Sequence, residues 1–462
     1  MNLPRRNLLT GAAATAAATA LTSSPATAAP GGSRRAGSTS PVGVTGGGMP
    51  KGRILIRNGH VIDTEPQPVA HARTDVLIDK GRITAVGRNL RSQGATVIDA
   101  TDHIVLPGFV DTHRHLWHSP LRSAAVDMDL GAYFRMLGQV GPRFRPQDVY
   151  HATLAGALEC LDSGVTTQLD FAHIAYSSEL AGAAVDGLKA AGLRAVFGYG
   201  TPVNVTSGGK LADVRRIRRR LADDNALVTM AYAPLGPLTT SMRTVAEDWH
   251  IADVLDLPLT FHLAASTVNP RPVLALRDAG LLREKTLYVH GSGLGDDELK
   301  AIADSGATAS ATPGDEAGRL RDAGITMGLG MDTVAFAPGD MFTTMRATHL
   351  AGQIAEDPRM TAKDVLRMAT LDGAAALGLA DRTGSLRPGK QADIIMIRLD
   401  DLNMLTAERD PIGAVVTAAQ PHNVDTVLVA GRVVKADGRL VHADLRRTAR
   451  NLRATAAAVS TR

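Results

Sequence analysis

The sequence predicts an α/β protein: a (β/α)8 barrel of the TIM type with a small β-sandwich domain built from both chain ends. Between residues 104 and 330, eight short apolar segments alternate with amphipathic segments of helical length, which is the order and size of a closed barrel. Short segments of alternating polarity with glycine turns flank this region on both sides, and they most simply pair into one small sheet. A doubly wound open sheet is the alternative, but no glycine-rich phosphate loop follows the first strand.

Each element has a predicted place in the chain. Barrel strands are expected at 104–112, 166–171, 195–199, 227–233, 258–263, 286–290, 308–312 and 325–330, with helices such as 149–162, 178–191 and 240–255 between them. Strands of the small domain are expected at 53–58, 61–63, 75–79, 83–86, 394–397, 426–429 and 432–434. The expected divisions are a signal peptide (1–29), a linker (30–50), the sandwich (51–106 and 384–442), the barrel (107–383) and a terminal helix (443–462).

The first thirty residues have the features of an export signal. Arg5 and Arg6 precede an apolar stretch at 11–21, and Ala26-Thr27-Ala28 has the small-x-small form of a cleavage site. The arginine pair resembles a twin-arginine signal, whose pathway exports folded proteins. We therefore expect a secreted or extracytoplasmic protein that uses the twin-arginine export machinery and keeps no membrane span after cleavage. The lone Cys160 cannot form a disulfide within the chain and is expected to be a buried structural thiol.

Charge and composition exclude some partners. The first fifty residues hold four of the 50 basic residues and none of the 46 acidic ones, so residues 51–462 carry 46 of each. Residues 51–462 therefore have no net formal charge, and aromatic residues make up only 3% of the chain. This composition does not predict a nucleic-acid partner.

Polar residues that can bind a metal follow several of the predicted strands. His113 and His115 end the first strand two residues apart, so both side chains face the same side. His262 ends the fifth strand, His290 ends the sixth, and Asp332 follows the eighth. Because active sites of such barrels lie at the carboxyl ends of the strands, this pattern predicts a site for zinc, iron(II), manganese or nickel.

At these residues the sequence resembles a known family. The segment Leu-Pro-Gly-Phe-Val-Asp-Thr-His-Arg-His at 106–115, the later His262, His290 and Asp332, and the closing segment 384–393 are similar to the amidohydrolase superfamily. The cytosine-deaminase-like and triazine-hydrolase-like branch is the most similar. The resemblance covers about residues 51–445.

The resemblance implies a role for each residue. His113, His115, His262 and Asp332 would bind one divalent metal, zinc first and iron as the alternative. Asp332 would take a proton from the metal-bound water, and His290 would polarise the substrate or orient that water. The fourth strand ends at 230–234 without the lysine that bridges two metals in binuclear members, which favours a single ion. The implied reaction is attack of metal-bound hydroxide on a non-peptide C–N bond of a small cyclic nitrogen compound.

One position departs from the family. Deaminases of this branch have a glutamate three residues after the strand-five histidine, where it carries a proton to the leaving amine, but this chain has Ala265. Candidates to replace it are Glu316 and Asp315 in the loop after strand seven, and Asp170 with His173 after strand two. A lyase, a decarboxylase or another hydrolase of the same fold remains the alternative function.

Other residues near the same strand ends are candidates for contacting the substrate. Trp117 and His118 follow the histidine pair, and Asp170 and His173 follow the second strand. Asp170 is expected to orient a ligand or a loop through hydrogen bonds. Trp117 is equally compatible with packing at the rim. Homo-oligomers are common in the family, and the sequence leaves the oligomeric state open.

Overall fold

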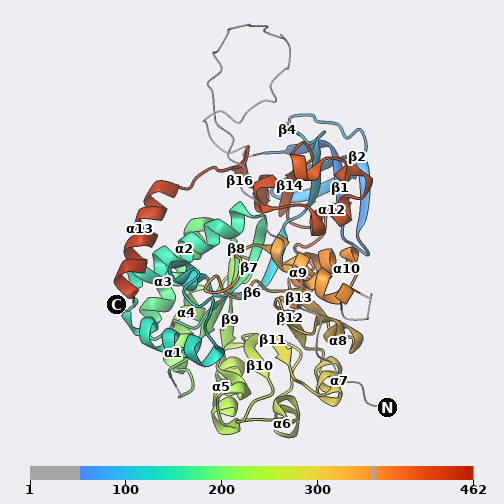
Figure 1. The fold of residues 1–462 in the computed structure, drawn as a ribbon. Coiled ribbons are helices and arrows are strands. Elements are labelled where there is room, and N and C mark those ends of the chain that lie inside the picture. The colour runs from blue at the N-terminus through green and yellow to red at the C-terminus, as the bar shows by residue number, and fades with distance from the viewer. Residues whose placement is uncertain (1–51, 206, 355–359, 461–462) are drawn as a thin grey trace, which may run out of the picture. The chain divides into compact units, whose positions relative to one another are not determined.

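Eight parallel strands close into a barrel in the computed structural model, which describes residues 52–205, 207–354 and 360–460 (Figure 1). The barrel strands are β6 (Phe109–Arg114), β7 (Val165–Ala172), β8 (Arg194–Gly200), β9 (Val228–Ala233), β10 (Leu259–Ala264), β11 (Thr286–Ser292), β12 (Thr308–Ala311) and β13 (Met327–Leu329). β13 pairs with β6 and closes the ring. The expected signal peptide, its arginine pair and the linker lie outside the described residues.

Helices follow the strands along the chain. They are α2 (Pro146–Asp162), α3 (Ser178–Ala191), α4 (Leu211–Arg220), α5 (Met242–Leu255), α6 (Pro272–Asp278), α7 (Asp296–Asp304), α8 (Ala317–Asp322) and α9 (Met341–Ile354). Local sequence sets their ends: the Ser177 side chain accepts a hydrogen bond from Leu180 N at the start of α3, and Gly192 ends that helix with a φ of +74°. A 3-10 helix, η1 (Leu116–Leu121), and α1 (Leu130–Val140) lie between β6 and α2.

Both chain ends contribute to a second, mostly antiparallel sheet of nine strands. Its strands are β1 (Ile54–Asp63), β2 (Val69–Asp79), β3 (Arg82–Gly87), β4 (Thr96–Asp99), β5 (His103–Pro107), β14 (Ile394–Arg398), β15 (Val424–Val429), β16 (Arg432–Ala436) and β17 (Arg439–Leu440). The two ends meet where β14 pairs with β5. Alternate residues of β14 face different cores: Ile394 belongs to the core of this sheet, and Ile395 to the core shared with the barrel.

The predicted first barrel strand, 104–112, is two strands in the structure. The chain changes sheets at Gly108: β5 belongs to the nine-stranded sheet, and β6 begins the barrel. Gly108 N donates to Asp393 O, and a Cβ on this glycine would collide with the side chain of Thr166. An uninterrupted apolar run does not reveal such a change of sheet, because both strands are buried.

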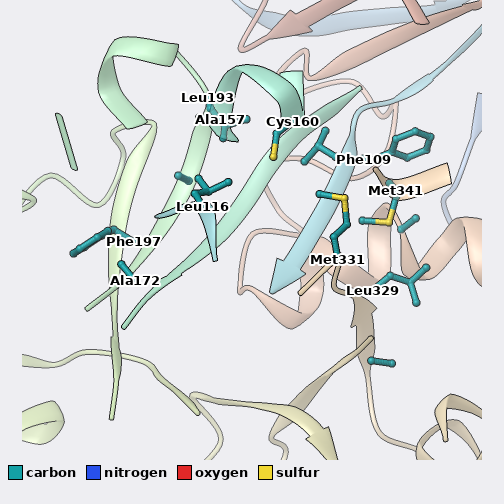
Figure 2. Close-up of a cluster of buried hydrophobic side chains, with 14 of the residues drawn as sticks. Phe109, Leu116, Ala157, Cys160, Ala172, Leu193, Phe197, Leu329, Met331 and Met341 are labelled. Carbon is teal, nitrogen blue, oxygen red and sulfur yellow. The ribbon is translucent and has the colours of Figure 1, made fainter. Parts of the chain in front are cut away.

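A continuous apolar core joins the barrel to its helices (Figure 2). Phe109 of β6, Cys160 of α2 and Met341 of α9 are all buried in it, so Cys160 is a buried thiol. Burial raises the pKa of that thiol to about 12, as expected for an unreactive cysteine.

A buried ion pair links the two sheets. Arg194 at the start of β8 donates to both carboxylate oxygens of Asp393, at 2.6 and 3.0 Å. The chain ends in α13 (Leu445–Val459), which packs against α2. Among the described residues, no helix combines the length and apolar character needed to cross a membrane.

Candidate metal centre and active site

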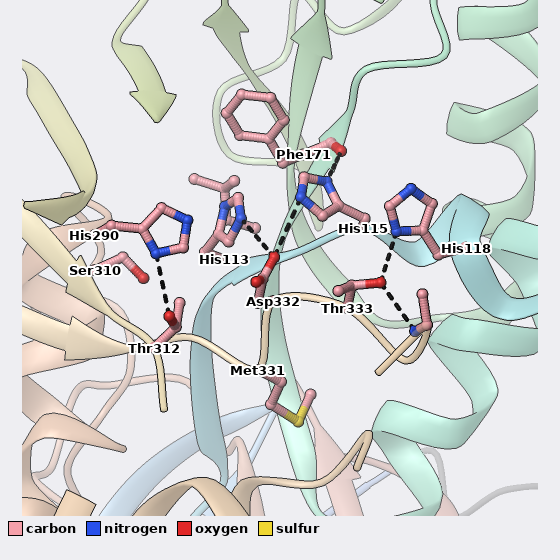
Figure 3. A network of polar contacts seen from close by, with 12 residues as sticks. His113, His115, His118, Phe171, His290, Ser310, Thr312, Met331, Asp332 and Thr333 are labelled. Atoms are coloured by element: carbon pink, nitrogen blue, oxygen red, sulfur yellow. Dashed lines mark hydrogen bonds and ion pairs between the residues drawn. The ribbon is translucent and has the colours of Figure 1, made fainter. Parts of the chain in front are cut away.

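Asp332, His113 of β6 and His115 just after that strand form the centre of the site. Asp332 Oδ1 lies 3.4 Å from Nε2 of His113 and 3.4 Å from Nε2 of His115. Figure 3 shows the three side chains pointing toward one another from β6 and from the turn after β13. The alternation of β6 turns both imidazoles to the barrel interior, as the two-residue spacing predicts.

Backbone hydrogen bonds hold these ligand-bearing segments together. His115 N donates to Asp332 O, and Asp332 N donates to His113 O, each at 2.9 Å. Asp111 Oδ1 accepts from His113 N and Met331 N, each at 3.1 Å. Asp332 has a φ of +59°, a conformation that non-glycine residues seldom adopt. This turn aims its carboxylate back at the histidines of β6.

His262 and His290 complete the group from β10 and β11. The His262 ring on β10 lies 4.9 Å from the His113 ring, centroid to centroid, and the His290 ring lies 5.5 Å from that of His262. Ligand atoms of His113, His262 and His290 lie within 4.8 Å of one another, as do those of His113, His115 and Asp332. The structure therefore brings together all the predicted metal-binding residues.

Protonation states of these groups suit a cation. Burial lowers the pKa of His113 to about 4 and holds that of His262 well below its usual value, so both imidazoles are neutral. His115 Nδ1 donates to the carbonyl oxygen of Phe171 at 2.8 Å, which leaves the Nε2 lone pair free toward Asp332. Burial opposes ionisation of Asp332, but the histidine contacts outweigh it and keep its pKa well below the usual range.

The donor set also contains unsatisfied atoms. Neither ring nitrogen of His113 has a hydrogen-bond partner, although the side chain is fully buried. Buried polar atoms without a partner are rare in folded proteins. Neutral imidazoles and an ionised carboxylate in this arrangement fit one divalent cation.

Asp315 lies beside His290. Its Oδ2 is 3.2 Å from His290 Nδ1 and accepts from Thr312 N at 2.7 Å. Burial lowers the pKa of His290, but the hydrogen bond to Asp315 and the negative charges of Asp332 and Asp315 together outweigh it, so the net shift is upward. The pKa of Asp315 is lowered, because the pairing with His290 and the hydrogen bonds from Thr312 outweigh its burial.

The structure does not bring Glu316 into this group. Glu316 Oε2 accepts from Arg319 at 2.7 Å, its side chain is 53% exposed, and it lies at the start of α8. Consecutive residues of a turn point in different directions, so only one of the two neighbouring acids reaches the histidine. The sequence does not show which of the two does so.

Ala265 is exposed just after β10, where its backbone N donates to Ser292 O on β11. The Ser292 hydroxyl in turn donates to Asp315 Oδ1 at 3.3 Å. Asp315, in the loop after β12, thus contacts both His290 and Ser292, the residue whose backbone oxygen accepts from Ala265.

A second layer of rings adjoins His115. The His173 ring lies 4.1 Å from the His115 ring and 5.2 Å from the rings of both His118 and Trp117, centroid to centroid. All four side chains are buried. Trp117 Nε1, His118 Nε2 and His173 Nδ1 have no hydrogen-bond partner.

Asp170 does not point at the imidazoles. Its Oδ1 accepts from Leu116 N at 3.2 Å, at the start of η1, and its Oδ2 has no partner. Burial raises its pKa to about 7. Asp170 therefore orients the turn that carries Trp117 and His118.

Some contributors were not predicted. Thr333 Oγ1 lies 2.7 Å from His118 Nδ1, and Thr312 Oγ1 lies 3.1 Å from His290 Nδ1. Both threonines are polar residues just past a strand end, a signal the sequence does contain. Arg114 lies between the two ligand histidines in the chain. Its side chain contacts α2 at Glu159 and Cys160, and the segment after Asp332 at Gly339.

Comparisons with known proteins agree with this geometry. The Amidohydrolase family matches residues 104–434. A 5-methylthioadenosine/S-adenosylhomocysteine deaminase of Pyrococcus furiosus is 31% identical over 414 residues, which cover 83% of this chain and 95% of that protein. A 5'-deoxyadenosine deaminase of Methanothermobacter thermautotrophicus is 30% identical over 414 residues, covering 83% of this chain and 93% of that protein.

Solved structures share the fold. An adenosine deaminase from Xanthomonas campestris with bound zinc has a TM-score of 0.78 and 25% identity, covering 88% of this chain and 98% of that one. A variant of atrazine chlorohydrolase from Arthrobacter aurescens, complexed with zinc and atraton, has a TM-score of 0.78 and 24% identity, covering 87% and 100%. The chain belongs to the amidohydrolase family and is a hydrolase of carbon–nitrogen bonds other than peptide bonds.

Proposed function

We propose that this protein is a zinc-dependent deaminase that removes an amino group from a small nitrogen heterocycle of the adenine nucleoside type. The observation that carries the proposal is the cluster of imidazoles around the ionised Asp332. The relatives with deaminase names, which align over more than four-fifths of the chain, support this substrate class.

Each residue has a role in this reaction. His113, His115, His262 and Asp332 would hold the cation, which as a Lewis acid lowers the pKa of water and polarises the reacting carbon. Asp332 is ionised at neutral pH and is the group that accepts a proton from the attacking water. His290, hydrogen-bonded to Asp315, holds a proton near the leaving nitrogen and donates it as the C–N bond breaks.

Trp117, His118 and His173 are proposed to contact the substrate. Each has a buried nitrogen without a partner next to the metal-binding group, and a heterocycle with ring nitrogens or an oxo group would satisfy such atoms. Asp170 supports this wall through Leu116. Asp315 replaces Glu316 as the candidate for the missing acid.

A second hydrolytic function is favoured by one observation. Ala265 cannot carry a proton, and a leaving group such as chloride needs none. One structural neighbour is named a chlorohydrolase, which fits this chemistry.

A substrate panel separates these functions. Zinc-loaded enzyme would be incubated with 5'-deoxyadenosine, 5'-methylthioadenosine and a chlorinated triazine, and released ammonia and chloride would be measured. Ammonia from the nucleosides is the expected result. Chloride without ammonia would replace the deaminase by the second function. His113→Ala is the control for contaminating activity.

We also propose export through the twin-arginine pathway, on the basis of Arg5 and Arg6 in the sequence. Replacing both arginines with lysine should leave the protein in the cytoplasm in a fractionation experiment. Export of that double variant at the original rate would contradict the proposal. Light scattering of the purified protein would show whether it forms the homo-oligomer that is common in the family.

A further inference from the structure

Arg114 is the last residue of β6 and stands between the predicted ligands His113 and His115 in the chain. His113 and His115 face the barrel interior, so the alternation of the strand turns Arg114 to the outer side. Its side chain is 1% exposed. The Arg114 backbone forms a bridge with Asp332, so this residue lies directly behind the metal-binding group.

The guanidinium group of Arg114 connects two other segments to β6. Nη2 donates to Glu159 Oε2, and Nη1 donates to Cys160 Sγ at 3.2 Å, both on α2. Nη1 also donates to Gly339 O at 3.1 Å, in the segment between Asp332 and α9. A Cβ on Gly339 would lie 2.8 Å from Val334 Cγ1 and 2.9 Å from Nη2, so the guanidinium packs closely against this glycine.

Few strand pairs join the ends of β6 and β13 to each other, whereas on its other side β6 is paired with β7, including Arg114 with Asp170. The strand ladder between them contains a single pair, Leu329 with Asp111. Beyond it, the isolated bridge of Arg114 with Asp332 and the backbone bonds of the adjacent histidines continue the pairing. The side-chain contacts of Arg114 therefore anchor this extension to α2.

We propose that Arg114 is a positioning residue that sets the distance between the histidine pair of β6 and Asp332. Its planar, five-donor group reaches Glu159, Cys160 and Gly339 at once, which a lysine ammonium on a flexible stem cannot reproduce. Loss of these contacts lets the segment after β13 move relative to β6 and spreads the ligand atoms. This inference rests on the metal-dependent function proposed above.

The test measures zinc affinity separately from turnover. Arg114→Lys, Arg114→Met and Glu159→Gln would be compared with the wild type by chelator competition, by the melting temperature of the metal-free protein, and by kcat and KM. Arg114→Met removes the buried cation, and Glu159 keeps its hydrogen bond from Arg122 at 2.7 Å. Arg145→Gln is the matched control, since it removes an arginine–carboxylate pair at the other end of α2.

The Arg114 variants should bind zinc about 10- to 100-fold more weakly, the usual effect of removing a group that orients metal ligands. Their kcat should fall, with KM changed less than about threefold, because the substrate wall is untouched. Arg145→Gln should change only the melting temperature.

Wild-type zinc affinity in a folded Arg114→Lys or Arg114→Met protein would overturn the inference. If neither variant folds, Glu159→Gln decides in the same way, because it keeps the arginine and the fold. A wild-type protein that binds no zinc would overturn the proposed function itself, along with this inference. Zinc binding without deaminase activity would leave the positioning role in place.

Discussion

Asp332 Oδ1 is equidistant from two imidazole nitrogens, 3.4 Å from Nε2 of His113 and 3.4 Å from Nε2 of His115. Asp332 is more than two hundred positions from both histidines in the chain. The closure of β13 on β6 brings it next to them. One carboxylate oxygen can therefore share a cation with the histidine pair and remain next to a water molecule on that cation.

Asp332→Asn should remove the proton acceptor while preserving the shape of the side chain. We expect kcat to fall by about 10²- to 10⁴-fold at saturating zinc, the usual contribution of a general base. Asp304→Asn, which changes an exposed acid paired with Lys300 on α7, is the matched control. A kcat within tenfold of the wild type would show that another group takes the proton.

Asp315→Asn and Glu316→Gln form a pair of neighbouring changes that test the proton donor. Asp315 contacts His290, whereas Glu316 contacts Arg319, so only the first change should matter. We expect at least about 10²-fold lower kcat for Asp315→Asn and nearly wild-type kcat for Glu316→Gln. The reverse order would return the role to Glu316.

Asp170→Asn should change the pH dependence of stability. Burial raises the pKa of Asp170 from 3.8 to about 7, so between these values the folded state keeps a proton that the unfolded chain has released. The wild type therefore loses stability as pH rises through this window, and the neutral asparagine does not. The difference in the free energy of unfolding, variant minus wild type, should therefore increase by a few kcal/mol between pH 4 and pH 7.

Urea unfolding at several pH values measures this difference. Asparagine can still accept the hydrogen bond from Leu116 N, so the two proteins differ mainly in whether residue 170 can ionise. A difference between the two proteins that does not vary with pH would mean that Asp170 ionises normally.

Asp393→Asn should lower the stability of the fold without touching the site. Arg194 is buried and depends on both oxygens of Asp393, and breaking a buried ion pair costs about 3–5 kcal/mol. Glu247→Gln, which breaks the exposed pair with Arg243 on α5, should cost less than about 1 kcal/mol. Equal urea midpoints for the two variants would contradict this role of the Arg194–Asp393 pair.

The fold class could be predicted from the sequence because barrel strands and helices alternate with a clear period. The chain also marks the ligand histidines, since each lies at or just past the carboxyl end of a strand that begins apolar. The change of sheet at Gly108 could not be seen, because β5 and the first residues of β6 are alike buried and apolar.

The choice between Asp315 and Glu316 could not be made either, because it depends on the backbone direction of one turn. The contacts of Arg114 were equally hidden. Its partners Glu159, Cys160 and Gly339 come from two segments far from β6 in the chain, and no local pattern relates them. Such contacts depend on tertiary packing, which the periodicity of the sequence does not predict.

Metal content of the purified wild type and of His113→Ala, measured by elemental analysis alongside turnover, tests the central claim most directly. The account predicts about one divalent ion per wild-type chain, with zinc restoring activity after chelation, and an His113→Ala protein that is folded, metal-poor and inactive. An His113→Ala protein with a full equivalent of tightly bound metal, or full turnover without any metal, would contradict it.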